Sequence, residues 1–229
     1  MILDLNKLFQ FVVAVSARYN IDESHSLGHS MRVFHFAEQI ANVEVQQPNP
    51  SIGLQYNYID GIQGPWVTNE PKQLLEKQRQ IIHAAAILHD TCDKKYRTES
   101  EGLIEIGNVL KPMMSSEDIE VTIRIIERMS YSKVTKYGMP DMGEYQFAFH
   151  VVREADLLDA YDFDRSVIFH FEKNRKTIEE SYKNAIDLFD TRVLKHMSDG
   201  LLLTNHAIRM HPEFSSKAIA RMAHWKAIL

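Results

Sequence analysis

The chain has a single cysteine, Cys92, among its 229 residues. One cysteine excludes an internal disulfide and every zinc motif that needs several thiolates, and it indicates a reducing compartment. The expected location is therefore cytoplasmic, or else nuclear. Long basic runs are also missing, and a net charge of -5 gives no reason to expect a nucleic-acid partner.

Long apolar runs are missing as well. No segment approaches the ~20 apolar residues that a membrane span requires, so we expect no membrane partner. Residues 8–17 superficially resemble a signal peptide, but Asp4 precedes them and Gln10 interrupts their apolar character. These features argue against a secretion signal and leave a helical pattern.

Apolar side chains recur at helical spacing along most of the chain, whereas no segment alternates as a strand does. Helices are predicted over residues 2–18, 26–41, 72–90, 101–110, 116–130, 145–162, 164–189 and 215–227. Breaks are predicted near Pro112, Gly138 and Pro212. Residues 43–70, rich in proline, glycine and amides, are predicted to form a long loop or an insertion. The predicted fold is all-α, with one domain over residues 1–229.

Four polar residues stand out because they interrupt apolar helical faces: His29, His89, Asp90 and Asp156. Buried polar groups of this kind are costly unless they are paired. Taken singly, each has an ordinary explanation, since a buried histidine is more often a satisfied core group than a ligand. Together, two imidazoles and two carboxylates suit one divalent ion, Mn²⁺ or Mg²⁺ first and Fe²⁺, Co²⁺ or Ni²⁺ otherwise.

The order of these residues carries a resemblance. His29 within HSMRV, His89 and Asp90 within ILHD, and Asp156 within EADLLDA together resemble the HD-domain superfamily of metal-dependent phosphohydrolases. The resemblance spans residues 22–162 and implies a helical bundle in which these four residues hold the metal. It also implies hydrolysis by a metal-bound water. Dinuclear members need additional histidine ligands between the HD pair and the last aspartate, and this chain has only His150 there, so one ion is expected.

The resemblance also suggests which residues act on the substrate. Asp93 matches an acidic position that orients or deprotonates the attacking water, although a solvated carboxylate at a helix end is an equal alternative. Developing negative charge on phosphate oxygens needs cationic partners. The candidate substrate contacts are the basic residues and one imidazole near the ligands: Arg32, Lys94, Lys95, Lys133 and His25. Asp159, one turn beyond Asp156, is a candidate for supporting a ligand.

The expected substrate is a small phosphorylated molecule, in particular a nucleotide. The resemblance is to small stand-alone members that include nucleotide pyrophosphohydrolases, which favours cleavage of nucleoside triphosphates to monophosphate and pyrophosphate. A 5′-nucleotidase acting on monophosphates, a non-catalytic nucleotide-sensing module and a structural metal site are the alternatives. Residues 163–229 are expected to form a helical extension. A homodimer is compatible with the chain, because helical domains of this kind commonly pair.

Overall fold

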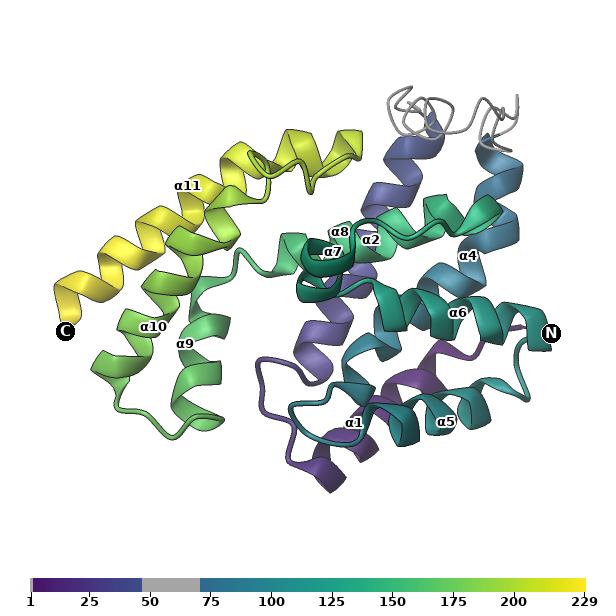
Figure 1. The fold of residues 1–229 in the computed structure, drawn as a ribbon, viewed down its shortest axis with the longest axis horizontal. Helices are drawn as coiled ribbons and strands as arrows, with labels where there is room; N and C mark the ends of the chain where they lie inside the picture. The colour runs from purple at the N-terminus through teal and green to yellow at the C-terminus, as the bar shows by residue number, and fades with distance from the viewer. Residues whose placement is uncertain (1, 47–70) are drawn as a thin grey trace.

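The computed structural model describes residues 2–46 and 71–229, and every regular element in these ranges is helical (Figure 1). The predicted all-α fold is confirmed. The α-helices are α1 (Leu5–Tyr19), α2 (Leu27–Gln46), α4 (Pro71–Leu88), α5 (Glu99–Leu110), α6 (Ser116–Arg128), α7 (Tyr131–Tyr137), α8 (Gln146–Asp159), α9 (Phe163–Glu172), α10 (Ile178–Thr191) and α11 (Asn205–Ile228). Short 3₁₀ turns lie at η1 (His89–Cys92), η2 (Gly143–Tyr145) and η3 (Val193–Lys195). Of the predicted loop 43–70, residues 43–46 continue α2, and residues 47–70 lie outside the described residues.

Helices α2, α4 and α8 form the centre of the main body, and each packs against the other two. The stretch from Ile81 to Leu88 on α4 is almost entirely buried, as its apolar sequence predicts. His83 is the polar exception, and its Nε2 lies 2.7 Å from a carboxylate oxygen of Glu38 on α2. Because the three helices pack face to face, polar side chains on their inner faces are brought together.

The first helix belongs to this body. Residues 8–17 lie within α1, where Leu8, Val12 and Val15 are buried and the helix packs against α4. Asp4 caps the helix by accepting a hydrogen bond from the backbone N of Lys7 (3.1 Å). Across residues 2–46 and 71–229, no helix combines the length and the apolar character needed to cross a bilayer.

The helices after residue 162 lie beside the main body and share a small apolar cluster of their own (Figure 1). The cluster includes Phe163 of α9, Phe189 of α10 and Ala218 of α11. α11 also packs against α2 and α8, so the extension and the main body are joined along this helix.

A buried carboxylate reinforces the joint between α8 and α11. Glu154 accepts hydrogen bonds from the backbone N atoms of Leu203 (3.0 Å) and Thr204 (2.9 Å) and from Thr204 Oγ1 (2.8 Å). Burial raises the pKa of Glu154 above its ordinary value. Because these donors immediately precede α11, Glu154 fixes the point at which that helix begins.

The prediction of one helix over 164–189 is wrong, since two helices occupy this range. α9 ends at Glu172, and a capping box begins α10, in which Thr177 Oγ1 accepts from the backbone N of Glu180 (3.2 Å) and Glu180 Oε2 accepts from the backbone N of Thr177 (3.1 Å). The reversal brings Phe163 against Phe189, with ring centroids 5.1 Å apart. Apolar spacing continues through the turn, so periodicity alone did not reveal it.

The predicted break near Pro212 is also wrong, because Pro212 lies inside α11. A proline in a helix interior removes a main-chain hydrogen bond and costs about 3 kcal/mol. Contacts on both sides of the proline offset this cost. Ile208 and Phe214 pack against the main core, and Ala218 packs into the cluster of the extension.

His196, which follows η3, is fully buried between the rings of Tyr131 and Tyr161, with centroid distances of 5.9 and 5.6 Å. Neither ring nitrogen has a hydrogen-bond partner among the described residues. Burial, together with the positive charge of Arg192, lowers the pKa of His196 to about 3. The folded chain therefore holds this imidazole neutral at pH values where an exposed histidine is protonated.

This burial predicts a dependence of stability on pH. The unfolded chain protonates His196 below its ordinary pKa of 6.5, whereas the folded chain does so only near 3, so stability falls as the pH decreases through this window. As the pH decreases through this window, the free energy of unfolding of His196→Phe should fall less steeply than that of wild type. The two slopes should differ by up to about 1.4 kcal/mol per pH unit. Urea unfolding at several pH values measures both slopes. His35→Phe, at an exposed position on α2, is the control, and equal slopes in wild type and His196→Phe would contradict the prediction.

Candidate metal centre

The four predicted ligand residues come from α2, from the 3₁₀ turn that follows α4, and from α8. His29 lies on α2, His89 and Asp90 begin the 3₁₀ turn η1 that directly follows α4, and Asp156 lies on α8. The change from α-helix to 3₁₀ turn at Leu88 lets two neighbouring side chains approach one point. Residues far apart in the sequence therefore meet where α2, the end of α4 and α8 converge.

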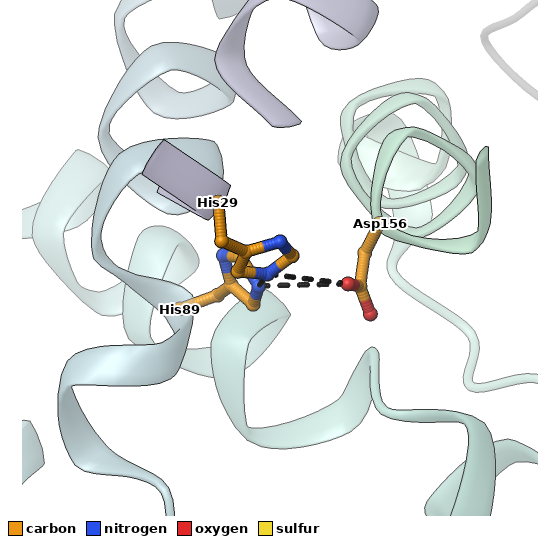
Figure 2. A group of neighbouring side chains, drawn as sticks. All are labelled: His29, His89 and Asp156. Carbon is orange, nitrogen blue, oxygen red and sulfur yellow. Dashed lines mark hydrogen bonds and ion pairs between the residues drawn. The ribbon is translucent and has the colours of Figure 1, made fainter. Parts of the chain in front are cut away.

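The imidazoles of His29 and His89 and the carboxylate of Asp156 point toward one another (Figure 2). The two Nε2 atoms are 3.0 Å apart, and Asp156 Oδ1 lies 3.5 Å from His29 Nε2 and 3.7 Å from His89 Nε2. One ligand atom from each residue lies within 4.8 Å of the others, a spacing that could hold a metal ion. Figure 2 shows the carboxylate facing both rings from α8.

The other nitrogen of each ring fixes its orientation. His29 Nδ1 donates to Asp159 Oδ2 (2.6 Å), and His89 Nδ1 donates to the backbone carbonyl of Ala86 (3.0 Å). With both Nδ1 atoms acting as donors, the two Nε2 atoms present lone pairs to each other. Neutral nitrogens in this arrangement repel unless a proton or a metal ion lies between them. Ligating histidines are held in the same way, with the second nitrogen donating to a carboxylate or a carbonyl.

Asp90 lies at the edge of this group. Its Oδ2 is 3.1 Å from His29 Nε2 and its Oδ1 is 3.5 Å from His89 Nε2. Oδ2 is nevertheless buried and makes no hydrogen bond of acceptable geometry within residues 2–46 and 71–229. A buried carboxylate oxygen without a donor is costly, and a cation would satisfy it. The two imidazole nitrogens and the Asp156 carboxylate could therefore hold one metal ion, with Asp90 at the edge of that group.

Electrostatics keep the carboxylates ionised. Burial alone would raise their pKa values, but the neighbouring imidazoles hold the pKa of Asp90 and of Asp156 well below the usual range. Burial likewise opposes the charge on His89, yet Asp90 and Asp156 outweigh it and raise the pKa of His89 to about 9. Without a metal, a proton on His89 offsets the negative charge. A bound cation would take the place of that proton.

A cavity of about 350 Å³ opens beside the ligands. His89, Asp90 and Asp156 contribute to its wall, whereas His29 is fully buried behind them. Most of the predicted substrate-facing residues also line it: His25, Asp93, Lys94, Lys95 and Lys133. The whole segment Met129–Lys133 lies along the same wall.

Asp93, Lys95 and His25 interact directly at the cavity. Asp93 Oδ1 accepts from the backbone N of Lys95 (2.8 Å), while its Oδ2 lies 3.2 Å from Lys95 Nζ. Lys95 Nζ in turn donates to His25 Nε2 (2.9 Å). On the far side of the ring, His25 Nδ1 lies 2.5 Å from Ser24 Oγ, which donates to Asp22. Asp93 is thus held in position at the cavity rather than left free in solvent.

Two predicted contacts have other partners. Arg32 does not line the cavity, because its Nε donates to Asp159 Oδ1 (2.6 Å) and its Nη2 to Asp159 Oδ2 (3.2 Å). It therefore supports the carboxylate that orients His29. Lys133 lines the cavity, but its Nζ donates to Glu99 Oε1 (2.5 Å), so its charge is already paired.

Sequence reasoning missed two arginines. Arg165 on α9 and Arg192 at the end of α10 both line the cavity, although they follow the segment 22–162 that carries the family resemblance. Arg165 Nη2 lies 3.2 Å from His29 Nε2, and Arg165 Nη1 lies 3.5 Å from Asp159 Oδ2. The sequence holds no signal that separates these arginines from surface ones, because their placement depends on how the extension packs against the body.

No family model matches the chain, and no curated protein or solved structure is significantly similar to it. The argument for the metal centre therefore depends on the geometry and chemistry of these residues.

Asp159 provides a test of this site. It is 2% exposed and accepts from His29 and Arg32, which holds its pKa near 2 against the opposing effect of burial. Asp159→Asn should weaken Mn²⁺ binding about 10- to 100-fold, the usual effect of losing a carboxylate behind a ligating histidine. Titration calorimetry measures the affinity. Asp187→Asn, at an exposed position on α10, removes the same charge as a control, and equal affinities in the two variants would contradict the role of Asp159.

Proposed function

We propose that this chain is a metal-dependent phosphohydrolase of the HD-domain type. The observation that carries the proposal is the pair of buried Nε2 atoms 3.0 Å apart, faced by Asp156 and lying beside a cavity that five lysines and arginines line together with five carboxylates. His29, His89, Asp90 and Asp156 would hold the ion. A bound divalent cation supplies Lewis acidity and lowers the pKa of a coordinated water toward neutrality.

Asp93 is the residue proposed to accept the proton of the attacking water. Its carboxylate lines the cavity close to the ligand Asp90 in sequence, and two contacts with Lys95 hold it in place. A general base has to be held within hydrogen-bond reach of the proton it removes. Lys95, bound to Asp93 and to His25, links the base to the substrate-facing wall.

The proposed substrate is a nucleoside triphosphate. Of the five lysines and arginines in the cavity wall, Lys95 and Lys133 are paired with carboxylates, whereas Lys94, Arg165 and Arg192 suit a chain of phosphates. Apolar side chains and an aromatic ring line other parts of the wall, including Ile126, Met129, Leu157 and Phe169, and these suit a base or a sugar. In the proposed reaction, water attacks the α-phosphorus, the bond from that phosphorus to the bridging oxygen breaks, and pyrophosphate leaves.

A 5′-nucleotidase is the second candidate. A cavity of about 350 Å³ is at the lower end of the range for ligand pockets, roughly 300 to 1,000 Å³. This size favours a small substrate such as a nucleoside monophosphate. The same ligands and the same water would then release orthophosphate.

The products distinguish the two reactions. With Mn²⁺ and a panel of nucleotides, we expect pyrophosphate from triphosphates, and orthophosphate from monophosphates alone would favour the nucleotidase. Asp156→Asn removes a ligand and should lower turnover by at least about 10²-fold, because a catalytic metal contributes several kcal/mol to the barrier. Asp187→Asn is the matched control, with its carboxylate exposed on α10.

Turnover that requires added metal and is lost in Asp156→Asn would support the phosphohydrolase. Nucleotide binding without any turnover, over the same panel and with each candidate metal, would contradict it and favour a sensing module.

A further inference from the structure

Two arginines from the helical extension reach the cavity of the candidate metal centre. Arg165 lies in the first turn of α9, and Arg192 directly follows α10. Both line the cavity together with Asp90 and Asp156, so residues beyond position 162 form part of its wall.

The side chain of Arg192 stacks on an aromatic ring. Its guanidinium lies over the ring of Tyr131, with Cζ 4.0 Å from the ring centroid. Its Nε is buried and has no hydrogen-bond partner in the part of the chain that the structure describes. Burial lowers the pKa of Arg192, because the negative charge of Asp156 offsets the lost hydration only in part. An under-satisfied cation beside a cavity is suited to an anionic ligand.

The Nε atom of Arg165 is hydrogen-bonded, whereas its two terminal nitrogens make only longer contacts. Its Nε donates to the backbone carbonyl of Ser24. Its two terminal nitrogens make longer contacts, at 3.2 Å to His29 Nε2, 3.5 Å to Asp159 Oδ2 and 3.9 Å to Asp90 Oδ2. The guanidinium therefore stands between the candidate ligands and the open cavity, with its forked edge incompletely bonded.

Two of the other cations in the cavity have nearer partners. Lys133 Nζ lies 2.5 Å from Glu99, and Lys95 Nζ lies 3.2 Å from Asp93. An added anion would have to compete with these carboxylates at the lysines. Arg192 makes no ion pair within residues 2–46 and 71–229, and an arginine offers two parallel N–H groups to phosphate oxygens.

We infer that Arg165 and Arg192 form a clamp for the phosphate chain of the substrate, an assignment that rests on the proposed phosphohydrolase function. Arg165, beside the ligands, binds the phosphoryl group that reacts. Arg192, stacked on Tyr131, binds the phosphate next to it. The substrate class that satisfies both arginines is a di- or triphosphate rather than a monophosphate. The helical extension thereby sets which phosphate esters the site accepts.

Inorganic triphosphate binding to the full chain tests the clamp. Titration calorimetry in EDTA removes turnover and leaves anion binding as the only readout. Arg192→Gln should weaken binding at least about 10-fold, because it removes charge-assisted hydrogen bonds to phosphate oxygens. The affinity of Arg192→Lys for triphosphate should lie between those of wild type and Arg192→Gln, because lysine keeps the positive charge but lacks the two parallel N–H donors of a guanidinium.

Orthophosphate and a distant arginine serve as controls. Arg192→Gln should change orthophosphate binding by less than about 3-fold, because a single phosphate beside Arg165 does not span both arginines. Arg18→Gln, at an exposed position on α1, changes the net charge equally and should alter triphosphate binding by less than about 2-fold. Arg165→Gln should weaken the binding of both triphosphate and orthophosphate. Thermal unfolding checks that each variant is folded.

The clamp would be overturned if wild type did not bind triphosphate, or if Arg192→Gln bound it as wild type does. Equal losses for triphosphate and orthophosphate in Arg192→Gln would overturn the assignment of separate phosphates to the two arginines. Failure of the proposed function looks different, because triphosphate binding would then depend on Arg192 while no nucleotide was turned over with metal. Metal-dependent turnover unaffected by Arg192→Gln would support the function and overturn the clamp.

Discussion

The arrangement of this chain depends on two buried imidazoles that present lone pairs to each other. Their Nε2 atoms are 3.0 Å apart, and each ring is oriented from behind, His29 by Asp159 and His89 by the carbonyl of Ala86. Two neutral acceptors at this distance are stable only when something positive lies between them. A proton meets that need in the metal-free chain, and the carboxylates around the rings favour it by raising the pKa of His89. A divalent cation would meet the same need, and the cluster of His29, His89 and Asp156 could hold one.

The packing of the three central helices creates this arrangement. α2, α4 and α8 each pack against the other two, which brings His29, His89 and Asp156 close enough that they could hold one ion. α8 is buried along nearly its whole length, with Asp156 and Asp159 toward the imidazoles and Glu154 toward the start of α11. One helix thus positions the candidate metal ligand and anchors the extension. Arg165 and Arg192 reach the cavity because the extension is fixed in this way.

The sequence predicted the elements of the site better than its surroundings. His29, His89 and Asp156 were recognised as candidates because each is a polar residue on an apolar helical face, a pattern that is visible in the sequence. Burial of such a residue is costly unless it is paired. Helix ends were harder, since the capping box at Thr177 lies within continuous apolar spacing and Pro212 is tolerated only through contacts made in three dimensions. Arg165 and Arg192 could not be found at all. An arginine on an amphipathic helix has the same pattern whether it faces solvent or a cavity.

Charge balance links the candidate metal centre to the arginines. Asp90 and Asp156 carry two negative charges, which a divalent cation would balance. Asp159 is committed to His29 and Arg32, and Asp93 is paired with Lys95. Once the carboxylates are assigned in this way, the donor at Arg192 is still unmatched, and burial makes the mismatch costly. A site organised around the metal alone would have no use for that charge, whereas a site that binds a metal together with a phosphate chain would need it where the structure places it.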